Sequence, residues 1–163
     1  MYTACYISPL GAIQVRADNS GLHSVLFIDD GAGQPGDTAP ATNSLVTAAI
    51  QQLDEYFHAG RRSFDLPLTP PGTQFQQQVW QELLQIPFGK TTSYSDIARR
   101  LNNPLSVRAV GTANGQNPIA ILIPCHRVIG ANGNLTGYAG GLWRKEFLLR
   151  LEGSGKYGQP TLW

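Results

Sequence analysis

The stretch IAILIPCHRVIG, residues 119–130, decides how the chain is interpreted. Its first five residues are apolar or small and predict a buried strand, which Pro124 ends. A cysteine, a histidine and an arginine follow directly. Because the chain of 163 residues contains only two cysteines and three histidines, this pairing at the end of a strongly apolar segment is a candidate for chemistry.

Cys125 and His126 have the residue types of a nucleophile and its base. A free thiol has a pKa of roughly 8.5 and needs a base, a positive charge or a helix N-terminus to react at neutral pH. Neighbouring side chains on an extended strand point to opposite faces, so His126 would act through a water, or the chain would turn at Pro124. Glu152, near the end of the last expected helix, is the leading candidate to orient the histidine. A structural cysteine beside a structural histidine is the alternative, and for an isolated pair it is the more frequent case.

The composition, 42% hydrophobic and 14% charged, is typical of a soluble globular protein. No apolar run approaches the roughly 20 residues that span a bilayer, and the first residues lack the features of a secretory signal. We therefore expect a cytoplasmic protein with reduced thiols, nucleoid-associated if its source is prokaryotic, and no membrane partner. The cysteines and histidines have no paired spacing, so we expect neither a metal site nor a cofactor.

Charge is divided unevenly along the chain. Residues 1–72 contain three basic and seven acidic residues, a net charge of −4, whereas residues 73–153 contain eight basic and four acidic residues, a net charge of +4. The second half could therefore face a polyanion such as nucleic acid. A chance division of ordinary surface charge is the alternative.

Residues 1–72 predict a small supporting α/β domain with an antiparallel sheet, a helix and a linker. Turn residues separate β-rich runs, which are residues 3–7, 12–18 and 22–28. Apolar residues at 46, 50, 53 and 57 then predict an amphipathic helix. The proline- and glycine-rich segment 65–72 is the expected boundary.

Residues 73–153 predict a mostly helical domain that contains a helix-turn-helix. Thr73 and Gln76 form a capping box at the start of its first helix. Two shorter helices follow with a tight turn between them, and the second is rich in alanine and glycine. Small residues allow another helix or a ligand backbone, including DNA, to approach closely. Residues 154–163 are expected to form a flexible tail.

The run IPCHRVIG, with NPI and RAVG upstream and TGYAGG downstream, resembles the O6-alkylguanine-DNA alkyltransferase family, whose members repair methylated guanine in DNA. The similarity covers residues 73–153 closely and in order, and the N-terminal domain agrees in size and general pattern. The resemblance implies that the alkyl group moves irreversibly to a cysteine of the protein, once per molecule.

The resemblance also implies roles for individual residues. It makes Cys125 the nucleophile, His126 the base that acts through a water, and Glu152 the residue that orients the base. Asn117 matches the asparagine that braces the recognition helix and the active-site turn. Tyr94 matches the tyrosine that protonates guanine N3 as the leaving group departs, although it could instead simply cap its helix.

Further positions match contacts to the DNA and to the flipped base. Arg108 matches the arginine that fills the gap left by the flipped nucleotide, although it could instead pair with a phosphate or a carboxylate. The other DNA contacts implied are Tyr94, Thr112 and Ala113. The pocket positions implied are Tyr138, Ala139, Val128 and Pro124. The implied partner is double-stranded DNA bearing O6-alkylguanine, bound through its minor groove by a monomer and largely without sequence preference, with cooperativity on DNA left open.

Two departures and two rival functions accompany the resemblance. Some relatives hold a structural zinc in the N-terminal domain, where Cys5 is the one cysteine of this chain, and some have serine where this chain has Ala139. A lesion-flagging DNA-binding protein is one rival, but the related alkyltransferase-like proteins replace the cysteine that Cys125 retains. A cysteine hydrolase is the other rival, and it would need an oxyanion hole and would release its product. The range of alkyl groups is left open.

Overall fold

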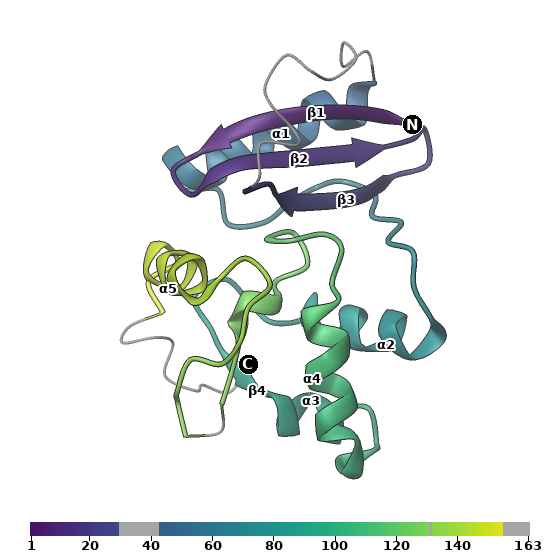
Figure 1. Ribbon diagram of the computed structural model, residues 1–163, viewed down its shortest axis with the longest axis vertical. Coiled ribbons are helices and arrows are strands. Elements are labelled where there is room, and N and C mark those ends of the chain that lie inside the picture. Colours follow the sequence, from purple (N-terminus) through teal and green to yellow (C-terminus); the bar gives the residue numbers. More distant parts are fainter. Residues whose placement is uncertain (30–42, 131, 155–163) are drawn as a thin grey trace. The chain divides into compact units, whose positions relative to one another are not determined.

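The structure is a computed structural model that describes residues 1–29, 43–130 and 132–154. The chain folds as two compact units (Figure 1). The first consists of residues 1–71 together with 118–122, and the second contains the other described residues. Apart from Ser154, the predicted tail lies outside the described residues. Among the helices that the structure describes, none has the length and apolar character needed to cross a membrane.

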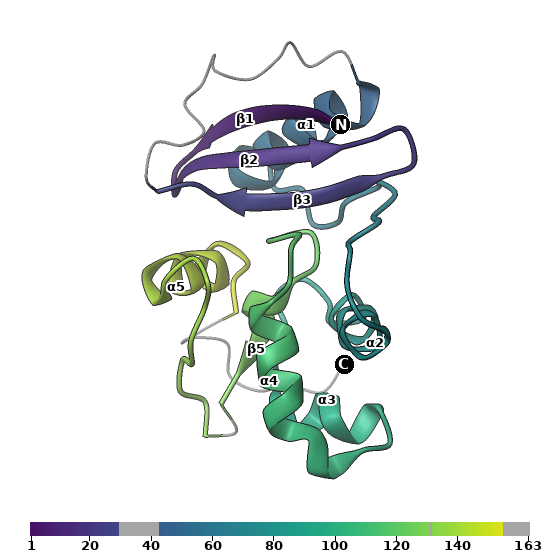
Figure 2. The same ribbon diagram turned by 45° about the vertical axis from the view of Figure 1, so that its right-hand side comes forward.

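The first unit is a three-stranded antiparallel sheet with one helix against it (Figure 1, Figure 2). Its elements are β1 (Tyr2–Ser8), β2 (Gly11–Ala17), β3 (Leu22–Phe27) and α1 (Ser44–His58). Successive strands are neighbours in the order β1-β2-β3, as tight turns between antiparallel strands require. This arrangement confirms the predicted small α/β architecture.

Alternation along the strands builds the core of this unit. In β2, Ile13, Val15 and Ala17 are buried, while the residues between them are more exposed. The helix α1 begins at Asn43, whose side chain accepts hydrogen bonds from the first turn of backbone amides. Its buried residues are Val46, Ala49, Leu53, Tyr56 and Phe57, which form one apolar stripe.

The predicted strand over residues 119–123 is wrong. Only Ile119 pairs with the sheet, opposite Val25, through the bonds Val25 N–H to Pro118 O (2.9 Å) and Ala120 N–H to Val25 O (2.8 Å). The chain then turns, with Ile121 at φ +72°, a left-handed conformation that costs a β-branched residue about 1–2 kcal/mol. The apolar residues are buried one by one in turns, and a short apolar run gives no signal that distinguishes this case from a strand.

The second unit is mostly helical. Its elements are α2 (Gln74–Leu83), β4 (Thr92–Ser93), α3 (Tyr94–Arg100), the 3-10 turn η1 (Pro104–Ser106), α4 (Val107–Gly115), the 3-10 turn η2 (Cys125–Arg127), β5 (Val128–Ile129) and α5 (Leu142–Leu151). The helices α3 and α4 contact each other across the short connection that contains η1 (Figure 2). The predicted helix-turn-helix is therefore present. Strands β4 and β5 pair in parallel and join the start of α3 to the turn η2.

Two interactions fix α2 in this unit. The predicted capping box is confirmed, since Thr73 Oγ1 accepts from Gln76 N–H (3.1 Å) and Thr73 N–H donates to Gln76 Oε1 (2.8 Å). Trp80 is fully buried, and its Nε1–H donates to Ala113 O at 2.9 Å. Because Ala113 belongs to α4, the indole joins α2 to the second helix of the helix-turn-helix.

We predict that Trp80→Phe lowers the free energy of unfolding by about 2 kcal/mol, because the Ala113 carbonyl loses one of its two donors, keeping only Gln116 N–H (3.2 Å), and the smaller ring fills less of the core. Urea unfolding followed by circular dichroism measures the change. The matched control is Trp143→Phe, since the Trp143 side chain is 58% exposed and its replacement should change stability by less than about 0.5 kcal/mol. Equal effects of the two substitutions would contradict the assigned role of the indole.

Candidate active site

The site is built on the turn η2, where the chain reverses at Pro124. Cys125 N–H donates to Ile123 O (2.8 Å), which closes a γ-turn centred on Pro124, and Arg127 N–H donates to Pro124 O (3.0 Å), which closes one 3-10 turn. With about three residues per turn, consecutive side chains diverge by roughly 120°. The turn therefore sends Cys125, His126 and Arg127 in three directions while burying all of them. Of the two geometries open from the sequence, an extended chain or a turn, the structure has the turn.

Glu152 binds both residues that follow the cysteine. The carboxylate lies at the C-terminal cap of α5 and is only 4% exposed. His126 Nε2 is 2.8 Å from its Oε2. Arg127 donates from Nε to Oε1 (2.8 Å) and from Nη2 to Oε2 (3.0 Å), the two-pronged geometry that a guanidinium and a carboxylate favour. Arg127 Nη1 also donates to Ile86 O at 2.6 Å.

The carboxylate remains ionised in this setting. Burial by itself raises the pKa of Glu152, but the hydrogen bonds and positive charges of His126 and Arg127 outweigh it and hold that pKa well below its usual range. Burial lowers the pKa of His126 below its ordinary value, against the pull of Glu152. The histidine is therefore neutral at physiological pH, as a group must be if it is to accept a proton.

The hydrogen bond to Glu152 also decides which imidazole nitrogen is basic. A carboxylate can only accept, so His126 Nε2 carries the hydrogen and donates it. The lone pair is then on Nδ1, which is buried and has no hydrogen-bond partner. An unsatisfied buried nitrogen is costly and requires an explanation. Here it is the one open basic position of His126.

The Cys125 thiol is buried among amide side chains. Burial raises its pKa, while a hydrogen bond from Asn117 and the charge of Lys145 act in the opposite direction. Asn117 also donates from Nδ2 to Ile123 O at 2.8 Å, and Asn114 donates from Nδ2 to Cys125 O at 3.5 Å. The cysteine therefore stays a thiol at rest and needs a base to become a nucleophile.

Tyrosines surround the same position. The hydroxyl of Tyr94, the first residue of α3, lies 2.5 Å from Thr136 Oγ1, and burial raises its pKa. The Tyr138 hydroxyl is buried without a partner, and burial raises its pKa well above the usual range. Both phenols are close enough to Cys125 for a thiolate there to raise their pKa further.

The other predicted pocket positions differ in exposure. Pro124 and Val128 are buried beside the turn, and Val128 pairs with Thr92 in the short parallel ladder. Ala139 is exposed in the loop before α5.

The predicted DNA contacts on α4 also differ in exposure to solvent. Arg108 and Thr112 are exposed on α4, one helical turn apart, with Thr112 Oγ1 donating to Arg108 O at 3.2 Å. Ala113, predicted with them, is only 2% exposed and accepts the Trp80 indole hydrogen bond. Its side chain faces the interior, so Ala113 does not belong to the exposed face of α4.

Three buried polar residues at the site were missed from the sequence: Asn114, Arg127 and Lys145. Two of them carried a signal. Asn114 follows Val110 at helical spacing on the buried face of α4, and Lys145 precedes Leu148 and Leu149 on the buried face of α5. A polar side chain on an apolar helical face requires a buried partner. Thr136, in the loop before α5, carried no such signal.

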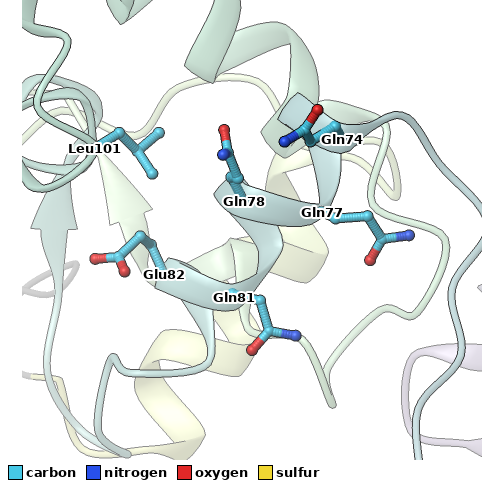
Figure 3. A pocket seen from close by; sticks show the side chains of 6 residues that line it. All are labelled: Gln74, Gln77, Gln78, Gln81, Glu82 and Leu101. Carbon is cyan, nitrogen blue, oxygen red and sulfur yellow. The ribbon is translucent and has the colours of Figure 1, made fainter.

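A separate hollow of about 400 Å³ lies beside α2 (Figure 3). It is lined by Gln74, Gln77, Gln78, Gln81, Glu82 and Leu101. None of these residues is a nucleophile or belongs to the set predicted for chemistry. Within the described ranges, no group of three or more histidine, cysteine, aspartate and glutamate residues could hold a metal ion.

Comparison with known proteins supplies family relationships. Residues 1–70 match the family model described as 6-O-methylguanine DNA methyltransferase, ribonuclease-like domain, and residues 74–154 match the model described as 6-O-methylguanine DNA methyltransferase, DNA binding domain. The chain is 49% identical to a methylated-DNA–protein-cysteine methyltransferase of Methanosarcina acetivorans, over 94% of this chain and 99% of that protein. It is 45% identical to the protein of the same name from Mycobacterium bovis, over 95% and 94% of the two chains.

Solved structures agree. The fold superposes on a crystal structure of Mycobacterium tuberculosis OGT in complex with DNA with a TM-score of 0.83 and 42% identity, over 94% of each chain. It superposes on Mycobacterium tuberculosis O6-methylguanine methyltransferase with a TM-score of 0.80 and 41% identity, over 94% of this chain and 93% of the other. With two family domains matched in order and close similarity over nearly its whole length, the chain belongs to the O6-methylguanine-DNA methyltransferase family of DNA repair proteins.

Proposed function

We propose that this chain repairs O6-alkylguanine in double-stranded DNA by moving the alkyl group onto Cys125, once per molecule. The observation that carries the assignment of Cys125 is the buried, unpartnered Nδ1 of His126, the residue that directly follows this buried cysteine. In this proposal residues 73–153 bind DNA and transfer the alkyl group, and residues 1–72 support them. Because the substrate is DNA, the protein acts where DNA is held, which in a prokaryote is the cytoplasmic nucleoid.

The first step makes the nucleophile. A water joins Cys125 Sγ to His126 Nδ1, and the thiol proton passes through it to the imidazole. The imidazolium that forms is stabilised by Glu152, whose carboxylate is already ionised. Lys145 favours the thiolate by its charge. The proton transfer therefore starts from a neutral thiol and a neutral imidazole, and it forms the thiolate and the imidazolium within the same site.

The second step is a single displacement. The thiolate attacks the alkyl carbon, the S–C bond forms as the C–O6 bond breaks, and the electron pair of the broken bond passes to the guanine. Tyr94 donates a proton to guanine N3, so the base leaves neutral. Tyr138 and the backbone N–H of Ala139 hold O6, while Pro124 and Val128 wall the pocket. A thioether has no good leaving group, so the protein is not regenerated.

DNA binding rests on the exposed face of α4. Small residues there allow the helix to approach the sugar-phosphate backbone closely in the minor groove, where contacts carry little sequence information. Arg108, at the start of the helix, occupies the space that the flipped nucleotide leaves, and Thr112 lies one turn further along the same face. One protein molecule suffices for one lesion. Ala113 is left out of this surface because it is buried.

Transfer to Cys125 is tested by intact-mass measurement after incubation with excess O6-methylguanine duplex DNA. We expect one added methyl group per molecule, located on Cys125 by peptide mapping. Cys125→Ser should acquire none, whereas Cys5→Ser, which removes the other cysteine of the chain, should acquire one. Tight lesion binding without any mass change would instead identify a lesion-flagging protein, and turnover with a released product would identify a hydrolase.

We predict that Glu152→Gln slows methyl transfer about a hundredfold, because a neutral amide neither stabilises the imidazolium nor enforces its tautomer. Single-turnover rates across pH measure this. The wild-type rate should fall only below pH 6.5, since burial lowers the pKa of His126 from that value. The Glu152 carboxylate raises the pKa of His126. Its removal should therefore lower that pKa further and move the acidic fall in rate to still lower pH.

The matched control for that substitution is Glu146→Gln, which removes a partly exposed carboxylate from the same helix. It should transfer methyl groups at the wild-type rate. Circular dichroism checks that both variants are folded. A folded Glu152→Gln protein with the wild-type rate and pH profile would refute the proposed role of the carboxylate.

We predict that Arg108→Ala slows repair of duplex DNA about tenfold or more, because nothing then fills the gap left by the flipped base. Reaction with the free base O6-methylguanine, which needs no flipping, should be unchanged. Arg150→Ala removes the same charge from an exposed site on α5 and should leave both rates unaltered. A similar loss with both substrates would show that Arg108 supports the fold and not the flipping step.

A further inference from the structure

Thr136 lies between two groups that the proposed reaction uses. Its Oγ1 is 2.5 Å from the Tyr94 hydroxyl and 3.4 Å from Lys145 Nζ, and its carbonyl oxygen accepts from Lys145 Nζ at 3.2 Å. Three elements thus meet at one side chain: α3 through Tyr94, the loop through Thr136 and α5 through Lys145. No part of the mechanism derived above assigns a role to Thr136.

The direction of the hydrogen bond is fixed at the Lys145 end of this network, and at the Tyr94 end it follows from where the Thr136 hydroxyl hydrogen points. A lysine ammonium has hydrogens to donate and no lone pair, so Lys145 can only donate to Thr136. A hydroxyl that accepts from the ammonium has its own hydrogen free for the Tyr94 oxygen. The Tyr94 hydroxyl, having accepted that hydrogen, is left with its own O–H free to donate elsewhere.

Burial makes this direction persistent. Lys145 is fully buried, with 0% of its surface exposed, so its ammonium is not rotated away by water. Burial lowers the pKa of Lys145 to about 8, which leaves it mainly charged at neutral pH, and the nearby Cys125 favours that charge. The hydrogen bond from Thr136 lowers the pKa of Tyr94, against the effect of burial.

We propose that Thr136 is a positioning residue for alkyl transfer: its hydroxyl, held by Lys145, turns the Tyr94 hydroxyl so that the phenolic hydrogen is presented to N3 of the departing guanine. This rests on the proposed function, in which Tyr94 is the acid. In the reaction the Tyr94 O–H bond breaks and the N3–H bond forms. The Thr136 hydroxyl then donates its hydrogen bond to the resulting phenolate, which stabilises the negative charge left on Tyr94.

The test compares Thr136→Val, which replaces the hydroxyl by a methyl group of similar size, with Thr136→Ser, which retains the hydroxyl. Single-turnover methyl transfer and DNA binding are measured for both. We expect the valine variant to transfer about tenfold more slowly, as the loss of one directed hydrogen bond would cause, with unchanged DNA affinity. The serine variant should stay within about threefold of wild type.

A double-mutant cycle with Tyr94→Phe separates positioning from a structural effect. In the Tyr94→Phe background, Thr136→Val should cause no further loss, because there is no phenol to orient. Thr136→Val should also cause no loss when Tyr94 is retained but the DNA contains 3-deaza-O6-methylguanine, because this base has no N3 to protonate. If Thr136 had only a structural role, Thr136→Val would slow every one of these reactions equally.

The outcomes are distinct. An undiminished rate for Thr136→Val, or a loss of equal size in the Tyr94→Phe background, overturns the inference while wild-type methyl transfer still stands. A wild-type protein that transfers no methyl group overturns the proposed function itself. Thermal unfolding of each variant is recorded with the rates, and Thr136→Ser supplies the folded comparison if the valine variant is destabilised.

Discussion

The buried carboxylate of Glu152 is the interaction on which the site depends. One side chain at the end of α5 binds two consecutive residues of η2, His126 through Nε2 and Arg127 through two nitrogens. A charge this deeply buried is tolerated only when it is paired and hydrogen-bonded, and removal of one partner costs about 3–5 kcal/mol. The carboxylate therefore fixes where the turn lies and, through the histidine tautomer, which nitrogen is left as a base.

Burial explains how one cysteine can be both inert and reactive. The environment that raises the pKa of Cys125 keeps it a thiol at rest, and Asn117 and Lys145 only moderate this effect. A thiol at rest is protected from oxidation, since susceptibility follows thiolate character and exposure. In the proposed function, reactivity then requires His126 as the base, and burial lowers the pKa of His126. Since each molecule reacts once in the proposed function, protection before the encounter matters as much as speed during it.

The order of the motifs predicted the architecture, the structure brings His126 and Glu152 together as expected from the sequence, and the failures have identifiable causes. Glu152 could be matched to His126, although 26 residues separate them, because the ordered motifs resemble one family. The strand expected at residues 119–123 failed because apolar residues buried in turns look like a strand. Ala113 was predicted to contact DNA, whereas it is buried and its carbonyl accepts the hydrogen bond of the Trp80 indole. Thr136 was missed because its partners come from two other elements, which local sequence does not bring together.

The helix α4 links the two tasks that the family combines. Its exposed face carries Arg108, while Asn114 in its last turn and Asn117 just beyond it hold the carbonyls of Cys125 and Ile123. Amide donors on buried carbonyls leave little freedom, because an unmade bond there costs about 1–3 kcal/mol. The position of the sulfur is therefore set by the same short helix whose other face we propose meets the DNA. In the proposed function, a base flipped beside Arg108 is delivered to a nucleophile whose place is already fixed, which reduces the entropy that alkyl transfer must overcome.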